Sequence, residues 1–263
     1  KTKVLTHKIA YIIEERHVKP WNILAITFTN KAANEMKERV SKLIGDIAND
    51  MWIGTFHSIC VRILRRYIDR MGFDSSFVIF DTSDQKSLIK ECMKELNIDD
   101  KMFSDKSFIS AISNAKNDMQ DPEEYERQTN NEKRKEVIAE VYKLYQKKLR
   151  DNNALDFDDI INYTINILMS EPDALEYYSE KFKYVLVDEY QDTNKAQFTL
   201  ITILSARNGN ITVVGDNDQG IYSFRGADIS NILNFEKDFP GTRIIKLEQN
   251  YRCTKNILKV ANE

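Results

Sequence analysis

Two adjacent carboxylates, Asp188 and Glu189, directly follow the apolar run at residues 184–187. A short unbroken apolar run is typical of a strand buried on both faces of a parallel sheet, and ligands bind at the carboxyl edge of such sheets. At that edge Asp188 could hold Mg²⁺, and Glu189 could activate a water for attack on a γ-phosphate. Taken by themselves, Asp188 and Glu189 could also be an acidic strand end followed by helix-capping residues. The longer run through Gln191 and Asp192 is more specific.

The first two residues, Lys1 and Thr2, lead directly into an amphipathic helix with apolar positions at Leu5, Ile9 and Ile12. They resemble the end of a phosphate-binding loop, in which the lysine reaches the β- and γ-phosphates and the hydroxyl binds Mg²⁺. The glycines of such a loop would precede residue 1. We therefore expect the sequence to be cut from a longer chain.

Two later segments carry further candidates. In residues 214–227, Gln219 is suited to sense a phosphate, and the side chains suited to stack on bases or pair with a backbone phosphate are Tyr222, Phe224 and Arg225. In residues 247–252, Arg252 could reach the γ-phosphate and Tyr251 could stack on adenine. The structural alternatives are a glycine-rich loop with its rings in the core and a surface arginine at a strand end.

The elements that must position these residues alternate along the chain. Strands are expected at residues 23–28, 51–55, 184–187, 211–214 and 243–247. Thr29 or Asn30 can cap the helix after the first strand, which should stop near Gly45. From about residue 80 to 155 only helical spacing is seen, which indicates a helical insertion. Alternating strands and helices predict an α/β fold with a parallel sheet covered on both faces.

Composition narrows the class of protein. The 263 residues are 42% hydrophobic and 30% charged, with a formal net charge of −3, which excludes disordered and collagen-like chains. Any nucleic-acid contact must therefore be a local groove. The cysteines Cys60, Cys92 and Cys253 form no disulfide or zinc pattern, and no apolar run reaches the ~18 residues of a membrane span. These features predict a cytoplasmic protein without a membrane contact. The arginines at 62, 65, 66 and 70 are interpreted as a solvated helix face.

The sequence resembles the superfamily 1 DNA helicases of the UvrD/PcrA/Rep group over essentially its whole length. The segment from Asp188 looks like motif II, and residues 215–227 look like motif III. Residues 155–159 resemble the segment where the chain re-enters the first motor domain. The remaining similar segments are 27–33 for motif Ia, 54–58 for motif Ib and 250–252 within motif IV.

The resemblance implies a RecA-like P-loop NTPase domain, 1A, with an inserted all-helical subdomain, 1B. The expected division is residues 1–80 for the first part of 1A, 81–155 for 1B and 156–263 for the second part of 1A. The implied activity is ATP- and Mg²⁺-dependent 3′→5′ helicase and translocase action on single-stranded DNA, in DNA repair and replication. The implied partners are single-stranded DNA, its junction with duplex, and repair or replication proteins.

The resemblance also carries roles in nucleotide chemistry onto single residues. Lys1 would contact the phosphates, and Thr2 and Asp188 would serve Mg²⁺. Glu189 would be the catalytic base. The residues that would contact the γ-phosphate are Gln219 and Arg252, and Tyr251 would stack on adenine.

The single-strand path implied by the resemblance is lined by Phe28, Asn30, Thr55, His57, Tyr222, Phe224 and Arg225. Stacking on an aromatic ring suits a motor that must ignore base sequence. For His57, a polar cap on its helix is the alternative. The sequence departs from the family at Gly220, where serine is usual, and at Phe224, where tryptophan is frequent.

The resemblance is compatible with three hypotheses about the function of the whole protein. The first is the motor half of a repair and replication helicase, with a second RecA-like domain of the same parent chain downstream. The second is the motor part of a helicase–nuclease of the RecB/AddA type. The third is a non-catalytic DNA-binding module. As an N-terminal motor-domain fragment, the chain is expected not to unwind DNA alone.

Overall fold

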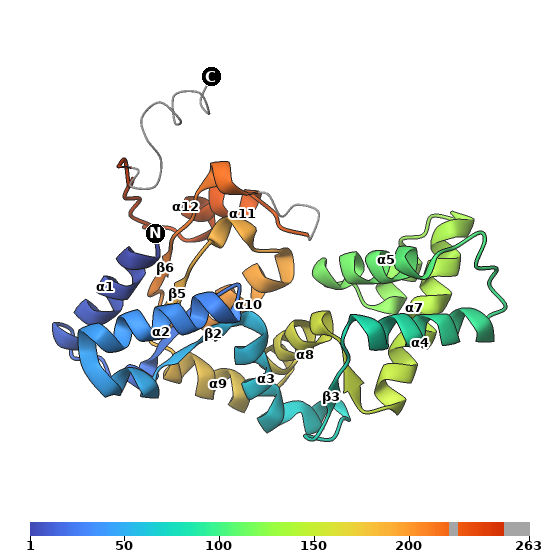
Figure 1. Ribbon diagram of the computed structural model, residues 1–263, viewed down its shortest axis with the longest axis horizontal. Coiled ribbons are helices and arrows are strands. Elements are labelled where there is room, and N and C mark those ends of the chain that lie inside the picture. The colour runs from blue at the N-terminus through green and yellow to red at the C-terminus, as the bar shows by residue number, and fades with distance from the viewer. Residues whose placement is uncertain (221–225, 250–263) are drawn as a thin grey trace. The chain divides into compact units, whose positions relative to one another are not determined.

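Figure 1 shows the fold as a computed structural model that describes residues 1–220 and 226–249. The chain divides into a large compact unit, Lys1–Ile232, and a small one, Leu233–Glu263. Tyr222, Phe224, Arg225, Tyr251 and Arg252 lie outside the described residues. The roles expected for them therefore stay predictions.

A four-stranded parallel sheet forms the centre of the large unit. Its strands lie in the order β2-β1-β5-β6, and each neighbouring pair is parallel. The strands are β1 (Ile23–Thr27), β2 (Trp52–Thr55), β5 (Tyr184–Val187) and β6 (Ile211–Val213). Every residue of β1 is buried, which explains its nearly unbroken apolar run. The α/β class and these four strands are confirmed.

Helices pack against the sheet and against one another. Ile23 and Ala25 of β1 share a buried cluster with Leu5 and Ile9 of the first helix and Met36 of the second. Helix α8 (Phe157–Ser170) contacts α3 (Phe56–Tyr67), α9 (Pro172–Lys181) and α10 (Lys195–Ser205). The first and second helices are α1 (Thr2–Glu14) and α2 (Asn30–Ile44).

Caps at the carboxyl edge of the sheet set where two helices begin. The Thr29 hydroxyl accepts a hydrogen bond from the backbone N–H of Ala32 at 3.1 Å, so Thr29 is the cap of α2. The helix ends at Gly45, whose φ of 74° favours glycine. In α3, Thr55 and Ser58 form a capping box. These caps fix the chain directly after β1 and β2.

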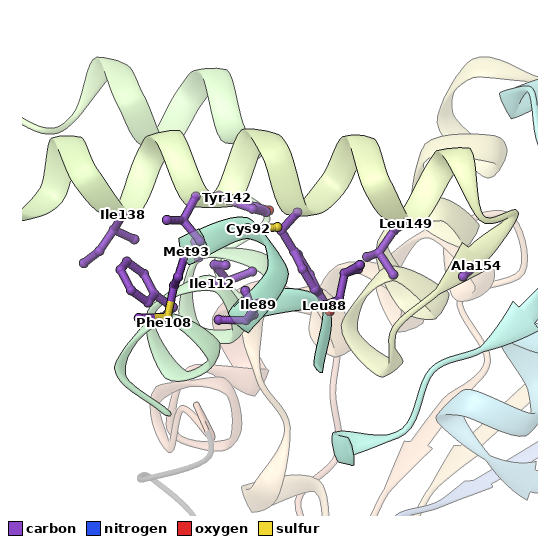
Figure 2. Close-up of a cluster of buried hydrophobic side chains, with 13 residues drawn as sticks. Leu88, Ile89, Cys92, Met93, Phe108, Ile112, Ile138, Tyr142, Leu149 and Ala154 are labelled. Atoms are coloured by element: carbon purple, nitrogen blue, oxygen red, sulfur yellow. The ribbon is translucent and has the colours of Figure 1, made fainter. Parts of the chain in front are cut away.

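The stretch between β3 (Val78–Ile79) and β4 (Ala154–Leu155) is helical, as predicted. Its helices are α4 (Thr82–Glu95), α5 (Asp105–Asn117), α6 (Pro122–Arg127) and α7 (Lys133–Asp151). Figure 2 shows side chains of α4, α5 and α7 that meet in a core of their own. The short parallel pair β3–β4 joins the two ends of this stretch. The sequence did not predict this pair, because two residues are too few for a periodic pattern.

A buried ion-pair cluster joins α5 to the start of α8. The ammonium of Lys116 lies 2.7 Å from Asp156 Oδ2 and 2.7 Å from Asp159 Oδ1, and its side chain is 2% exposed. Tyr145 of α7 donates a hydrogen bond to Asp156 at 3.0 Å. Just beyond Lys116, the Asn117 carbonyl oxygen Oδ1 accepts a hydrogen bond from Asn194. The end of α5 is therefore fixed both to α8 and to the segment that follows β5.

The strand predicted at residues 243–247 is wrong. The described part of the small unit contains the short helix α12 (Phe235–Asp238), and residues 243–249 have no regular secondary structure. The apolar side chains of Ile244, Ile245 and Leu247 are exposed, and no described strand pairs with them. A strand needs both a partner and a buried face, and an apolar pattern supplies neither. In the described residues, no helix is long and apolar enough to cross a membrane.

Candidate nucleotide-binding site

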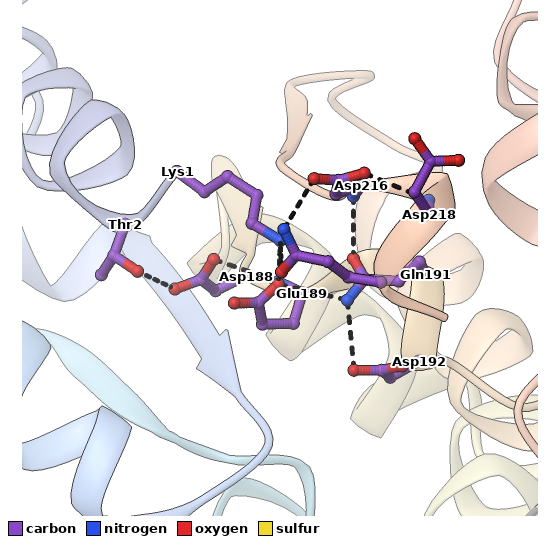
Figure 3. A network of polar contacts seen from close by, with 9 residues as sticks. Lys1, Thr2, Asp188, Glu189, Gln191, Asp192, Asp216 and Asp218 are labelled. Atoms are coloured by element: carbon purple, nitrogen blue, oxygen red, sulfur yellow. Dashed lines mark hydrogen bonds and ion pairs between the residues drawn. The ribbon is translucent and has the colours of Figure 1, made fainter. Parts of the chain in front are cut away.

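Side chains from segments far apart in the sequence meet at the carboxyl edge of β5. Figure 3 shows Lys1 and Thr2, at the start of α1, directed toward Asp188 and Glu189. Lys1 Nζ lies 2.5 Å from Glu189 Oε2, and it donates a hydrogen bond to Gln219 Oε1 at 3.1 Å. The Thr2 hydroxyl donates to Asp188 Oδ2 at 2.6 Å. The structure therefore brings together five of the residues predicted for nucleotide chemistry.

The backbone conformation after β5 positions the carboxylates of Asp188 and Glu189. The N–H of Asp188 donates to the carbonyl of Ile26 in the neighbouring strand at 3.0 Å, so Asp188 still follows the sheet. Glu189 then adopts a left-handed conformation, with φ 49° and ψ 45°, before the short 3₁₀ helix Tyr190–Asp192. This conformation is unfavourable for a residue with a side chain, and such strain is held where the surroundings over-determine it. The turn places consecutive carboxylates side by side.

Gln191 connects the ends of β5 and β6. Its amide oxygen accepts a hydrogen bond from the backbone N–H of Asp216 at 3.0 Å, and its amide nitrogen donates to Glu189 and Asp192 at 3.2 Å each. The side chain is 2% exposed. Gly215 keeps this contact open, because a Cβ there would meet Gln191 Oε1 at 3.0 Å. The sequence alone assigns no separate role to Gln191, because a bridge between distant loops leaves no local signal.

The electrostatics of the site favour a bound cation. Burial raises the pKa of Asp188, and the charge of Glu189 raises it further. The hydrogen bond from Thr2 lowers this pKa and offsets part of the effect. Burial and Glu189 also raise the pKa of Asp192. Lys1 is the cation that faces this group in the described residues. A cation near Asp188 would relieve the repulsion among these carboxylates.

The residues at Asp188 fit a magnesium ion. A hydroxyl and a carboxylate oxygen, from Thr2 and Asp188, lie within hydrogen-bond distance of each other, and Mg²⁺ takes hard oxygen ligands. Among residues 1–220 and 226–249, no cluster of three or more histidine, cysteine, aspartate or glutamate side chains could hold a metal. In phosphate sites Mg²⁺ commonly has few protein ligands, and substrate oxygens complete its shell.

Four residues predicted for the DNA path lie at the neighbouring strand ends. Phe28 follows β1, and its ring packs edge-on against Phe56 with centroids 5.4 Å apart. Thr55 uses its hydroxyl as the cap of α3, so the alternative of His57 as that cap is wrong. The His57 ring packs against Phe157 at 5.3 Å, and burial lowers its pKa despite a backbone hydrogen bond at Phe157.

The remaining described member of that set is Asn30, which begins α2 and is exposed. Because β2 and β5 flank β1, these four residues and the nucleotide group share one edge of the sheet. Whether they contact DNA stays a prediction.

The chain belongs to the UvrD/Rep helicase family. The family model for the UvrD/REP helicase N-terminal domain matches residues 1–240, which confirms the resemblance and the RecA-like fold. The whole chain is 57% identical over 263 residues to the ATP-dependent DNA helicase PcrA of Staphylococcus epidermidis, covering 36% of that protein. It is 56% identical over 263 residues to PcrA of Staphylococcus aureus, again covering 36% of that protein. The chain thus spans about a third of the length of these relatives.

Proposed function

We propose that the protein is the ATP-binding part of an ATP-dependent DNA helicase that moves 3′→5′ along single-stranded DNA. The observation that carries the proposal is the contact of Lys1 and Thr2 with Glu189 and Asp188, which are far apart in sequence. A lysine and a hydroxyl facing consecutive carboxylates at a parallel strand end is the arrangement that P-loop NTPases use for nucleotide and Mg²⁺.

The side chains at the nucleotide site have different roles in the proposed ATP hydrolysis. Thr2 and Asp188 would hold Mg²⁺, which supplies charge neutralisation on the phosphates when it is bound. The ammonium of Lys1 pairs with Glu189 in this structure, and the phosphates of ATP would compete for it. Glu189, once released, can accept the proton of the attacking water. Gln219, which accepts a hydrogen bond from Lys1, would sense the terminal phosphate.

The domain division is part of the same proposal. Residues 1–80 and 156–263 would form the motor domain 1A, and residues 81–155 would form the helical subdomain 1B. Single-stranded DNA would cross the edge formed by Phe28, Asn30, Thr55 and His57, and a second RecA-like domain would complete the nucleotide site. A cytoplasmic location and action with repair or replication proteins belong to the same proposal, and the printed name of the relatives, ATP-dependent DNA helicase, supports DNA as the substrate.

The test is ATP hydrolysis with and without single-stranded DNA in the parent protein and in its Glu189→Gln variant. We expect turnover to fall by roughly 10²–10⁴-fold, the usual contribution of a general base, with ATP and DNA binding retained. The matched control is Glu176→Gln, which changes an exposed carboxyl of α9 outside the site. Unchanged turnover would contradict the assigned base. DNA binding without hydrolysis in the unmodified protein would instead indicate a non-catalytic module.

A further inference from the structure

A group of cations stacked on aromatic rings lies on α3 and α9, away from the nucleotide site. The guanidinium carbon of Arg62 is 3.6 Å from the ring centroid of Trp52, and Lys181 Nζ is 5.5 Å from the same ring. Arg66 and Lys181 lie 4.2 Å and 5.7 Å from the ring centroid of Tyr177. We call these five residues the cationic patch.

The positive charge of the cationic patch is not balanced by carboxylates. In the described parts of the chain, no Asp or Glu oxygen lies within 4.0 Å of Arg62, Arg66 or Lys181, whereas Arg70, the next arginine along α3, pairs with Glu171 at 2.8 Å and with Asp173. A guanidinium stacked on a ring keeps its N–H edge free for oxyanions. The arginines predicted to form a solvated face are exposed, and each of them also lies over an aromatic ring.

Tyr177 shows how the patch acts on a nearby oxygen. Arg66 donates a hydrogen bond to the hydroxyl of Tyr177. This contact and the charge of Lys181 lower the pKa of Tyr177, although burial raises it. The side chain of Tyr177 is 39% exposed. Arg66 and Lys181 thus both act on the hydroxyl oxygen of Tyr177, so the cationic patch stabilises negative charge on an oxygen that lies there.

The patch lies at the amino edge of the sheet. Trp52 is the first residue of β2, and the carbonyl of Lys181 accepts a hydrogen bond from Asn22, just before β1. Asp188 and Thr55, by contrast, lie at the carboxyl ends of β5 and β2. An occupant of the patch therefore does not share the nucleotide site.

We propose that the cationic patch binds a short carboxylate-rich segment of a partner protein. Three cations that no carboxylate of the described residues neutralises match two or three carboxylates of a partner, and an arginine can hold a carboxylate through paired N–H donors. DNA carries about one charge per 1.7 Å and needs a long basic row. The row along α3 is instead interrupted at Arg70, which Glu171 and Asp173 already neutralise. The extent of the patch thus fits a short acidic peptide.

The test is fluorescence anisotropy with a fluorescein-labelled hexaglutamate peptide. The comparison ligands are a hexaglutamine peptide and an unlabelled oligothymidylate of equal charge. We expect saturable binding of hexaglutamate at low salt that is about tenfold weaker in Arg62→Gln/Arg66→Gln, since each surface charge pair contributes modestly. The matched control is Lys86→Gln/Lys90→Gln, which removes two cations four residues apart on α4. Circular dichroism confirms that both variants fold.

Each result decides the proposal. Loss of peptide binding in the Arg62/Arg66 variant alone supports it. It is overturned by no saturable binding, by equal loss in the Lys86/Lys90 variant, or by an oligothymidylate that displaces the peptide and binds more tightly through the same arginines. Peptide binding should be the same in Glu189→Gln and in the presence of ATP, so failure here and failure of the proposed function are distinguishable.

Discussion

Replacing Lys116 with methionine tests the buried ion-pair cluster. Methionine keeps most of the side-chain volume but removes the ammonium that lies 2.7 Å from both Asp156 and Asp159. Removing one partner of a buried pair leaves uncompensated charge and typically costs about 3–5 kcal/mol. We expect a loss of this size in the free energy of unfolding at pH 8. The loss should shrink toward pH 5, because burial raises the pKa of Asp159 to about 7 and this carboxyl then takes up a proton.

Urea unfolding followed by circular dichroism measures the effect, and Lys148→Met is the matched control. Lys148 also lies between two carboxylates, Glu91 at 2.6 Å and Glu95 at 2.9 Å, but both of these are exposed to solvent. Water screens such contacts, so the control variant should lose far less stability. Adding Asp156→Asn and Asp159→Asn to Lys116→Met should restore part of the loss, since no buried charge is then unpaired.

The reasoning is refuted if Lys116→Met is no more destabilising than Lys148→Met. That result would mean that water or structural relaxation solvates the two aspartates without the lysine. A loss that stays constant from pH 8 to pH 5 would refute the expected pH dependence, because it would show that Asp159 does not take up a proton.

Three further predictions concern stability. Burial and the charge of Asp156 raise the pKa of Asp159 to about 7, so the folded state keeps a proton that the unfolded chain releases near pH ~4. The free energy of unfolding should therefore fall as the pH rises from ~4 to about 7. Asp159→Asn should make the fall shallower by up to about 1.4 kcal/mol per pH unit, and an unchanged slope in urea titrations would contradict this. Thr29→Ala should cost about 1 kcal/mol by removing the cap of α2, with Thr29→Ser nearly neutral; equal losses in thermal unfolding would exclude the cap. Gly54→Ala should lower the melting temperature, because its Cβ would meet Ser58 Oγ at 2.4 Å; an unchanged melting temperature would mean that Ser58 can move freely.

The sequence predicted the parts of the fold whose signal is local. The strands β1 and β5 are buried on both faces, and this burial produces the continuous apolar runs that marked them. Thr29 and Gly45 marked the ends of α2, because a cap and a left-handed terminus each demand particular residue types. The approach of Lys1 to Glu189 was expected because Lys1 and Thr2 resemble the end of a phosphate-binding loop, and because Glu189 follows a strand at the carboxyl edge of a parallel sheet.

Contacts between distant segments could not be predicted in this way. Nothing near Lys116 in the sequence indicates that its partners are Asp156 and Asp159. Gln191 bridges two loops through its amide, and no periodicity encodes that bridge. The false strand at residues 243–247 shows the converse, because an apolar pattern cannot specify whether a partner strand is present.

The small pair β3–β4 has a consequence for how the chain folds. In the sheet, β1 ends at Thr27, and its neighbour β5 begins only at Tyr184. The entropy cost of closing a loop rises with its length, and distant pairing slows folding. Val78 and Ala154 are paired at the ends of the helical stretch, which has its own core. If this stretch forms first, its ends lie one strand spacing apart, about 4.8 Å. The helical stretch then shortens the loop that β1 and β5 must close, so disrupting β3–β4 should slow assembly of the sheet.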